Sequence, residues 1–583
     1  MTDTALSKGL ALQQAKHDQP AFTTVPTTTP TRATLSRVLS DVMVPMRDGV
    51  RLATDAYLPE GPGPFPAILT RMPYGKTEPY CAMPAIARHW VAKGYAAVVQ
   101  DVRGKWGSEG RFEANKIGNE IPDGTDTIAW IAAQPWSDGR VGMWGESYFG
   151  FTSWAGAVGG HPALTCIAPG DITLDRFRGT YRYGALQLNT VGMWAIGMAA
   201  RTYQGMAHVD TWHLPLAEMA NAGGVPSPYF DDVVANPTPG PFWTERSLLQ
   251  ALDLVRIPVL HWSGWYDNYL GRVIADWRDL RARNAPTRHN HLFIGPWDHE
   301  GTADALHRVG LLPVDAGTGA HKWDTFQAFF DRYLMGLDNG FDRRGAAHVY
   351  TMGADRWIDL ENWPPPDAVA TDIFLHSGGR ANGLDGDGTL DRVRPGDEPP
   401  DRFVYDPADP VADTVEIDCW SLAGQMGDRR PIERRADVLV YTSAPLEADL
   451  EVTGPITATL HIQSSAPDTD FTVALVDVFE NQTAHLVQDG ILRARYRESL
   501  EAPSLLEPGR PYTLTVDLWA TSHVFRKGHW LRVEVSSSCF NRYDRNPNTA
   551  DLFGRAPAGV KATQTIHHAA DRASRITLPV RPG

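Results

Sequence analysis

Cysteine, long apolar runs and clustered basic residues are all scarce in this sequence. Its cysteines are widely spaced and form no Cys-x-x-Cys pair, which argues against a disulfide scaffold and favours reduced thiols; they are Cys81, Cys166, Cys419 and Cys539. No apolar run reaches the length of about eighteen residues that a membrane-spanning helix needs. We therefore expect a protein that neither spans a membrane nor depends on disulfides.

Positive charge is also limited. The chain carries 54 Lys and Arg residues against 69 Asp and Glu residues, a formal net charge of −15, and its basic residues do not cluster. This balance argues against a nucleic-acid partner and favours solubility. The pairs His289/His291 and His567/His568 have no matching carboxylate or cysteine at the spacing of metal ligands. We expect no metal and no other cofactor in the chemistry.

Residues 1–35 differ in composition from the rest of the chain. They are rich in Thr, Pro, Gln and Ala and lack the apolar segment of a secretory signal. Together with the scattered cysteines, this predicts a flexible extension on a cytoplasmic protein. The whole chain has 583 residues, 43% apolar and 21% charged, which is typical of a soluble globular enzyme with two or three domains.

The stretch from Gly145 to Gly150 reads Gly-Glu-Ser-Tyr-Phe-Gly and carries the strongest signal of chemistry. It follows the apolar run 141–144 and precedes a small-residue segment, which predicts a strand, a sharp turn centred on Ser147 and the start of a helix. Such a turn exposes the serine hydroxyl at a helix N-terminus, where backbone N–H groups stabilise a developing oxyanion. Because Gly-x-Ser-x-Gly also occurs by chance in glycine-rich chains, the assignment needs further residues.

A serine nucleophile requires a base, and the base requires a carboxylate that orients it. An apolar strand over 257–264 runs into Asp267, and a second over 291–295 runs into His299. The order Ser, Asp, His is the one expected for an α/β-hydrolase. Asp267 could instead cap the helix expected from residue 270, and Asp298 is a rival orienting acid, although neighbouring side chains point apart. Together the signals predict a triad of Ser147, Asp267 and His299.

The loop after the strand 65–70 is expected to supply an oxyanion donor. Tyr74 lies in this loop and would offer its phenolic O–H, although its ring could simply pack under the Pro-Tyr-Gly turn. Alongside the triad, Tyr74 becomes the favoured partner of the Tyr148 backbone N–H in the oxyanion hole.

Several motifs make the sequence resemble the cocaine esterase family of serine hydrolases, which also includes α-amino-acid ester hydrolases, glutaryl acylases and X-prolyl dipeptidyl peptidases. In chain order they are Val44–Leu52, Asp101–Gly104 with Ser108–Gly110, Gly145–Gly150, Gly264–Asp267, Gly295–His299 and Asp468–Phe471. The resemblance implies Ser147 as nucleophile, His299 as base and Asp267 as orienting acid. It also implies an oxyanion hole that pairs the Tyr74 hydroxyl with the Tyr148 amide.

The pattern of elements predicts an α/β-hydrolase core with an inserted helical cap and a C-terminal β-sandwich. A hairpin over 42–57 precedes alternating strands (67–70, 96–101, 141–144) and helices (84–93, 124–133), and a helix over 321–337 ends the alternation. We expect core segments at 36–174 and 249–366, a helical cap without clear strands at 175–248, and an antiparallel sandwich at 367–583. The resemblance implies that this sandwich is a jelly roll.

Aromatic residues are expected to line the substrate pocket. Trp265 and Tyr269 flank Asp267, and Trp194 and Tyr181 lie on the expected cap at positions that resemble the family's aromatic clamp; each could equally pack in the core. An aromatic lining favours aryl or benzoyl-type esters of moderate size as small-molecule substrates.

Two other functions stay open. The first is an amide-directed activity, as an acylase, an α-amino-acid ester hydrolase or an X-prolyl dipeptidyl peptidase. The second is a non-catalytic binding protein that uses the sandwich. The sequence also leaves open whether the chain forms a homo-oligomer.

Overall fold

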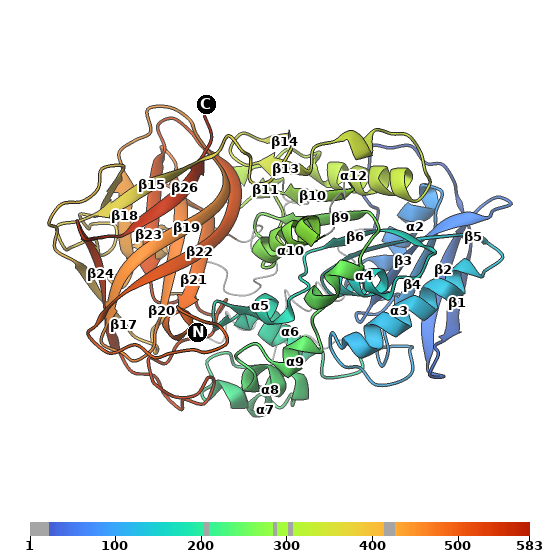
Figure 1. Cartoon of the computed structure of the whole chain (residues 1–583), viewed down its shortest axis with the longest axis horizontal. Coiled ribbons are helices and arrows are strands. Elements are labelled where there is room, and N and C mark those ends of the chain that lie inside the picture. The colour runs from blue at the N-terminus through green and yellow to red at the C-terminus, as the bar shows by residue number, and fades with distance from the viewer. Residues whose placement is uncertain (1–22, 203–208, 284–288, 301–306, 413–425, 583) are drawn as a thin grey trace.

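The computed structural model of the protein describes residues 23–202, 209–283, 289–300, 307–412 and 426–582. Figure 1 shows two parts side by side: a mixed α/β part, blue through yellow-green, and a β part, yellow to red. A group of short helices lies below the junction of the two parts. No helix among the described residues has both the length and the apolar character needed to cross a bilayer.

The α/β part is built on one sheet of ten strands. Its inner strands run parallel, whereas β1, β2 and β14 at its edges pair antiparallel. In spatial order the strands are β1 (Leu35–Pro45), β2 (Arg51–Pro59), β4 (Ala96–Asp101), β3 (Phe65–Met72), β5 (Ser137–Glu146), β6 (Leu164–Gly170), β9 (Val259–Gly264), β10 (Asn290–Gly295), β13 (Ala347–Thr351) and β14 (Arg356–Leu360). Strands β4, β9 and β10 are buried along their whole length, as expected for inner strands covered on both faces of a sheet.

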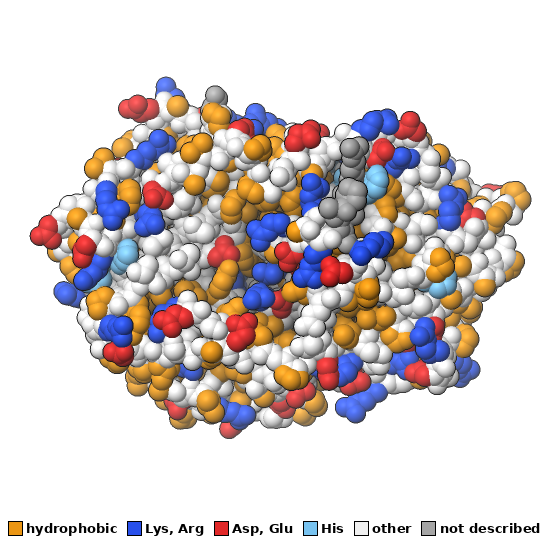
Figure 2. Space-filling view, in the orientation of Figure 1, with side chains coloured by type: hydrophobic (Ala, Val, Ile, Leu, Met, Phe, Trp, Pro, Cys, Tyr) orange, Lys and Arg blue, Asp and Glu red, His pale blue; other side chains and the backbone are white. Residues whose placement is uncertain are grey.

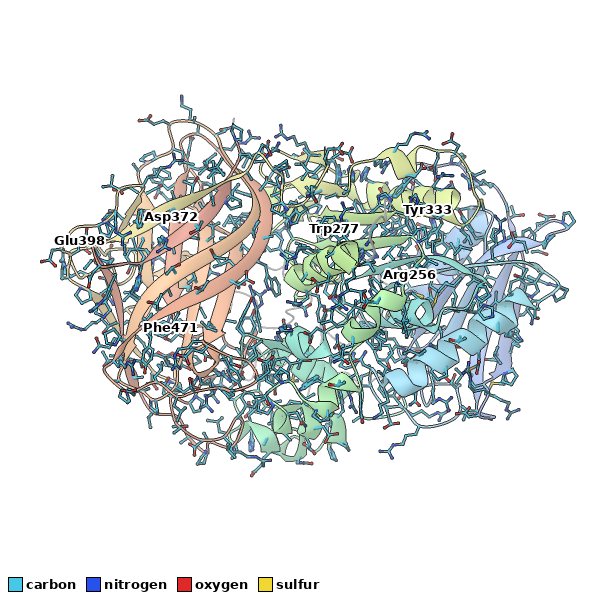
Figure 3. All side chains as sticks on the ribbon, viewed as in Figure 1. Arg256, Trp277, Tyr333, Asp372, Glu398 and Phe471 are labelled. Carbon is cyan, nitrogen blue, oxygen red and sulfur yellow. The ribbon has the colours of Figure 1, made fainter. Side chains whose placement is uncertain are left out.

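Five longer helices accompany this sheet: α2 (Met83–Ala92), α3 (Ile117–Ala132), α4 (Ser147–Gly159), α10 (Leu270–Arg283) and α12 (Thr318–Tyr333). The aromatic face of α12 packs beneath the strands β5 and β9: the Trp323 ring lies 5.2 Å from that of Trp144, and the Phe326 ring lies 5.1 Å from that of Trp262. On α10, Trp277 donates from its indole to the carbonyl of Asn290 at the start of β10 (Figure 3). These contacts hold β5, β9 and β10 in place.

The predicted core elements are confirmed, with shifts at their ends. The hairpin is β1 and β2, and the strand expected at 96–101 is β4. Helix α3 begins before the predicted residue 124 and accommodates Pro122, and α12 ends before the predicted residue 337, since Gly336 follows with a φ of 78°. Strands β13 and β14 extend the sheet beyond the point where the alternation was expected to end.

The described residues of 175–248 form mainly short helices, but β7 (Tyr181–Arg182) and β8 (Ala185–Leu186) form a small hairpin where no clear strand was expected. The helical segments here and just after are α5 (Arg176–Thr180), η1 (Leu188–Gly192), α6 (Met193–Gly197), η2 (Leu216–Glu218), α7 (Met219–Ala222), α8 (Pro228–Ala235), α9 (Pro241–Thr244) and η3 (Leu249–Leu254). The short elements β11 (Arg308–Val309), β12 (Leu312–Pro313) and η4 (Phe341–Arg343) follow within the α/β part.

The C-terminal part is a mostly antiparallel β domain, as predicted. Its one parallel pair among the described strands is β16 with β18. The strands are β15 (Val369–His376), β16 (Thr389–Asp391), β17 (Asp401–Tyr405), β18 (Leu439–Ser443), β19 (Leu450–Ser464), β20 (Asp470–Val478), β21 (Ala484–Arg493), β22 (Pro511–Phe525), β23 (Trp530–Ser536), β24 (Ala562–Ala569), β25 (Arg572–Ala573) and β26 (Arg575–Val580), with short helices α14 (Arg430–Glu433) and η6 (Ala494–Tyr496). Phe471, labelled in Figure 3, lies in their buried apolar core.

A buried arginine joins the short hairpin to the C-terminal domain. The guanidinium of Arg182 donates to the carboxylate of Asp489 at 3.0 Å and to the hydroxyl of Tyr543 at 2.8 Å, and it stacks 3.7 Å from the centre of the Trp519 ring. The Arg182 side chain is 2% exposed, so this pair is shielded from water and salt. The hairpin is therefore fixed to the β domain by charge as well as by packing.

We predict that Arg182→Ala destabilises the protein by about 3 kcal/mol, because it removes a buried ion pair and the contact with the Trp519 ring, although Arg542 still pairs with Asp489. Calorimetric unfolding should show a lower midpoint. Arg380→Ala is the matched control, since the Arg380 side chain is 83% exposed and its loss should change stability little. Equal midpoints for the two variants would contradict this view of the interface.

Candidate active site

Ser147 lies at the turn between β5 and α4. Its φ is +50°, in the left-handed region that residues with a side chain rarely adopt. The turn is tight enough to demand glycine before it: a Cβ on Gly145 would lie 2.3 Å from the backbone of Phe149. The strained backbone places the serine as the first residue of the 13-residue helix α4, where the helix dipole favours negative charge.

Asp267 and His299 follow the ends of the adjacent parallel strands β9 and β10. The Nδ1 atom of His299 lies 2.6 Å from Oδ2 of Asp267, and the Asp267 carboxylate also accepts the backbone N–H of Tyr269 at 2.7 Å. The two loops pack backbone against backbone, since a Cβ on Gly264 would lie 2.0 Å from the carbonyl oxygen of Trp297. The expected pairing of this acid with this histidine is therefore present in the structure.

Burial and charge act on the His299 imidazole in opposite directions. Burial disfavours the imidazolium, but the charge of Asp267 and its hydrogen bond outweigh burial, so the pKa of His299 is raised above its ordinary value. Burial also raises the pKa of Glu146 to about 7, against the opposing charges of His299 and Lys322. Glu146 directly precedes Ser147, and its charge is a further cause that raises the pKa of His299.

Tyr74 and Trp194 come from distant parts of the chain and meet. The indole Nε1 of Trp194, on α6, donates to the hydroxyl oxygen of Tyr74, in the turn after β3, at 3.0 Å. Because an indole can only donate, the Tyr74 oxygen is the acceptor in this contact. The Tyr148 side chain is anchored elsewhere: its hydroxyl donates to the Glu120 carboxylate at 2.7 Å and accepts from the backbone N–H of Asn115 at 3.2 Å.

A small pocket opens beside Ser147. Its described lining residues come from the core and from α5 and α6, and they are Asn115, Ser147, Tyr148, Ile172, Arg176, Trp194 and Tyr269. Of the four aromatic residues expected here, Trp194 and Tyr269 line the pocket, and the Tyr269 ring lies 5.8 Å from the His299 ring. Asn115 and Arg176 were not expected from the sequence, because neither belongs to a recognisable motif.

The other two aromatic residues lie elsewhere, contrary to expectation. Trp265 donates from its indole to the carbonyl of Tyr350 at 2.7 Å and packs against Trp363. Tyr181 donates from its hydroxyl to the carbonyl of Val233 at 2.9 Å and packs against Trp243. Both side chains are almost fully buried and satisfied by backbone acceptors, so they serve packing rather than the pocket.

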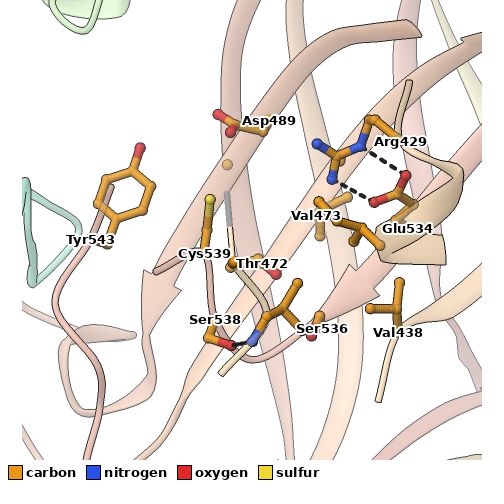
Figure 4. A pocket seen from close by; sticks show the side chains of 15 residues that line it. Arg429, Val438, Thr472, Val473, Asp489, Glu534, Ser536, Ser538, Cys539 and Tyr543 are labelled. Atoms are coloured by element: carbon orange, nitrogen blue, oxygen red, sulfur yellow. Dashed lines mark hydrogen bonds and ion pairs between the residues drawn. The ribbon is translucent and has the colours of Figure 1, made fainter. Parts of the chain in front are cut away.

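A second pocket lies wholly within the C-terminal domain (Figure 4). Its charged groups are already paired: Arg429 makes two hydrogen bonds with Glu534, at 2.9 and 2.6 Å, and Asp489 binds Arg182 and Arg542. None of the predicted site residues lines it. Among the described residues, no group of three or more His, Cys, Asp or Glu side chains could hold a metal ion.

Acidic and basic side chains are interspersed on the face shown in Figure 2.

Known proteins match this chain over nearly its full length. A cocaine esterase of Rhodococcus sp. (strain MB1 Bresler) is 38% identical over 93% of this chain and 98% of its own length. The chain belongs to the cocaine esterase family. The family model for X-Pro dipeptidyl-peptidase (S15 family) matches residues 48–301, and that for the X-Pro dipeptidyl-peptidase C-terminal non-catalytic domain matches residues 339–577. The protein is therefore a serine hydrolase of the cocaine esterase and S15 family.

Solved structures extend this family relationship to the fold. An aminopeptidase from the marine sediment archaeon Thaumarchaeota archaeon has a TM-score of 0.82 and 28% identity, and covers 97% of this chain and 99% of its own. An α-amino acid ester hydrolase has the same TM-score and identity, covering 96% of this chain and 99% of its own. These relatives of the cocaine esterase family thus include one named for esters and one named for peptides.

The contact between His299 and Asp267 predicts a measurable change in the pKa of His299 when Asp267 is replaced. Asp267→Asn should lower the pKa of His299, because it removes the charge that opposes the effect of burial. NMR of protein labelled at histidine can follow the titration. Glu300→Gln, which removes a carboxylate that contributes less to the same imidazole, is the control and should move the pKa by a smaller amount. A His299 pKa that is unchanged in Asp267→Asn would contradict the assigned contact.

Proposed function

We propose that this cocaine esterase family member hydrolyses carboxylic esters of small molecules through an acyl-enzyme. The hydrogen bond between His299 and Asp267, at the sheet edge where Ser147 occupies its strained turn, carries the proposal. The parallel strands β5, β6, β9 and β10 end at this edge and bring the nucleophile, the acid and the base to one side of the sheet.

In the first half-reaction the Ser147 hydroxyl oxygen attacks the ester carbonyl carbon while Nε2 of His299 takes the hydroxyl proton. Asp267 holds the proton on Nδ1 and stabilises the imidazolium. The tetrahedral intermediate then loses the alcohol, which receives its proton from His299. Water activated by the same imidazole cleaves the acyl-enzyme and releases the carboxylic acid.

The oxyanion of both intermediates is bound, in this proposal, by the hydroxyl of Tyr74 and the backbone N–H of Tyr148. The indole of Trp194 supports the first donor, because its hydrogen bond to the Tyr74 oxygen fixes the position of the phenolic group. The anchored side chain of Tyr148 supports the second, because it fixes the backbone that directly follows Ser147.

Ester substrates are favoured over substrates with a free α-ammonium group. An ammonium group needs carboxylates to bind it, and the described residues that line the pocket beside Ser147 include no Asp or Glu but do include Arg176. This lining disfavours the amino-acid ester and dipeptidyl activities for which some relatives are named. Aryl and other moderate-size acyl esters suit the rings of Trp194 and Tyr269.

Ser147→Ala should fold normally and lose at least about a hundredfold in kcat/KM toward p-nitrophenyl esters, because the nucleophile is gone. A fluorophosphonate probe should label wild-type protein at Ser147 and leave the variant unlabelled. Ser153→Ala, a hydroxyl deletion farther along the same helix, is the control and should retain labelling. Full activity of Ser147→Ala, or no label on wild-type protein, would favour a binding protein. Turnover confined to Xaa-Pro anilides would show that the substrate is an amide and would contradict the proposed ester hydrolysis.

Tyr74→Phe should reduce kcat by about 10²–10³, because it removes one oxyanion donor and leaves the triad intact. The fluorophosphonate should still label Ser147 in this variant, at a reduced rate. Tyr80→Phe, on a ring 5.5 Å from that of Tyr74, is the control for loss of a nearby phenol and should act near the wild-type rate. If both variants were equally active, the Tyr74 hydroxyl would have no role in the oxyanion hole.

A further inference from the structure

Arg176 is the first residue of α5 and lines the pocket beside Ser147. The residue is 2% exposed, and its Nε and Nη1 atoms are buried without a hydrogen-bond partner. Burying a guanidinium is costly unless an anion pairs with it. A buried cation of this kind at the rim of a reaction centre therefore requires an explanation.

Apart from Arg246, the other buried arginines in the described part of the chain are paired. Each forms an ion pair with a carboxylate within 4 Å; they are Arg71, Arg182, Arg429, Arg493, Arg532 and Arg542. Arg176 has no such partner among the described residues. Its charge is favoured by the neutral hydroxyl groups of Tyr269 and Tyr229, and it lies 5.6 Å from the centre of the Tyr269 ring. These phenols leave the positive charge uncompensated.

A second polar side chain in the same pocket is also without a partner. Asn115 is 1% exposed and adopts a left-handed backbone, with φ at 54°. Both the oxygen and the nitrogen of its carboxamide are buried and make no hydrogen bond. The pocket therefore holds a cation and an amide donor that could both bind one carboxylate.

We propose that Arg176, with Asn115, binds a carboxylate at the end of the acyl chain, so that the preferred substrates are monoesters of short dicarboxylic acids. This inference rests on the proposed function and specifies its substrate class. The acyl side is favoured over the alcohol side because His299, which must protonate the departing alcohol, is not among the described residues that line this pocket. Hydrolysis would release a dicarboxylate and an alcohol.

The test compares two esters of matched length, ethyl hydrogen succinate and ethyl pentanoate, with wild-type protein in a pH-stat. We expect kcat/KM to be at least about tenfold higher for the succinate ester, because a guanidinium–carboxylate contact in a shielded pocket exceeds the methyl contact that replaces it. A second pair, 2-acetoxyacetate and propyl acetate, places the carboxylate on the alcohol. A preference confined to this second pair would overturn the acyl-side assignment.

Variants then assign the preference to residues. Arg176→Met should lower the ratio of kcat/KM for the succinate ester over the pentanoate ester by at least about thirtyfold, and Asn115→Ala should lower it less. Arg178→Met removes the same charge from the same helix, but Arg178 is 39% exposed and paired with Asp175, so the ratio should stay at the wild-type value. Arg176→Lys keeps the charge without the planar fork and should give an intermediate ratio.

Stability separates a binding role from a structural one. If Arg176 binds substrate, Arg176→Met should unfold at the same or a higher temperature, because it removes an uncompensated buried charge. A lower midpoint together with an unchanged substrate ratio would assign Arg176 to the fold and overturn the inference. Hydrolysis of ethyl pentanoate that depends on Ser147, without a preference for succinate, would overturn this inference alone. Absence of Ser147-dependent hydrolysis of any ester would overturn the proposed function.

Discussion

The close approach of backbones at one edge of the sheet is the constraint on which the rest of the site depends. Each strand that leads to a proposed triad residue ends in or next to a glycine: Gly145 in β5, Gly264 in β9 and Gly295 in β10. A Cβ on Gly145 or Gly264 would lie 2.3 or 2.0 Å from backbone atoms of Phe149 or Trp297, and one on Gly295 would lie 2.4 Å from the Trp297 ring. The turn that presents Ser147 and the loops that join Asp267 to His299 exist only because these contacts are possible. The aromatic face of α12 holds the same strands from below, through Trp144 and Trp262.

This constraint also explains what could be predicted from the sequence. Glycine-flanked turns after apolar runs are local features, so the strands, the order Ser147, Asp267, His299 and the α/β-hydrolase core could be recognised without coordinates. Element ends were less accurate, as for α3, because a helix that tolerates Pro122 carries no clear start signal. Strands β13 and β14 were not expected in the sheet because they join it after a long helix.

The pocket could be predicted only in part, because its walls come from segments that meet through tertiary packing. Trp265 and Tyr181 have the same residue types as Trp194 and Tyr269. In the folded protein, Trp265 and Tyr181 donate to buried backbone carbonyls, whereas Trp194 and Tyr269 line the pocket beside Ser147. Arg176 shows the same limit more sharply. An arginine at the start of a short helix usually lies at a surface, and nothing in the local sequence indicates that this one is buried without a carboxylate.

The hydrogen bond from Trp194 to Tyr74 couples the short helices to the proposed chemistry. Trp194 lies on α6 and Tyr74 in the core, so the position of the phenolic oxygen depends on how α6 sits over the sheet. Ser227, at the start of α8, donates to the carbonyl of Ala195 at 2.9 Å and so ties α8 to α6. The hairpin next to α5 is in turn anchored by Arg182 to the C-terminal domain. A continuous path of polar contacts and short chain segments thus links the β domain to the helices that line the pocket. The C-terminal domain therefore has a physical route to affect the pocket, because loosening its contact with the hairpin would also loosen the helix that carries Arg176.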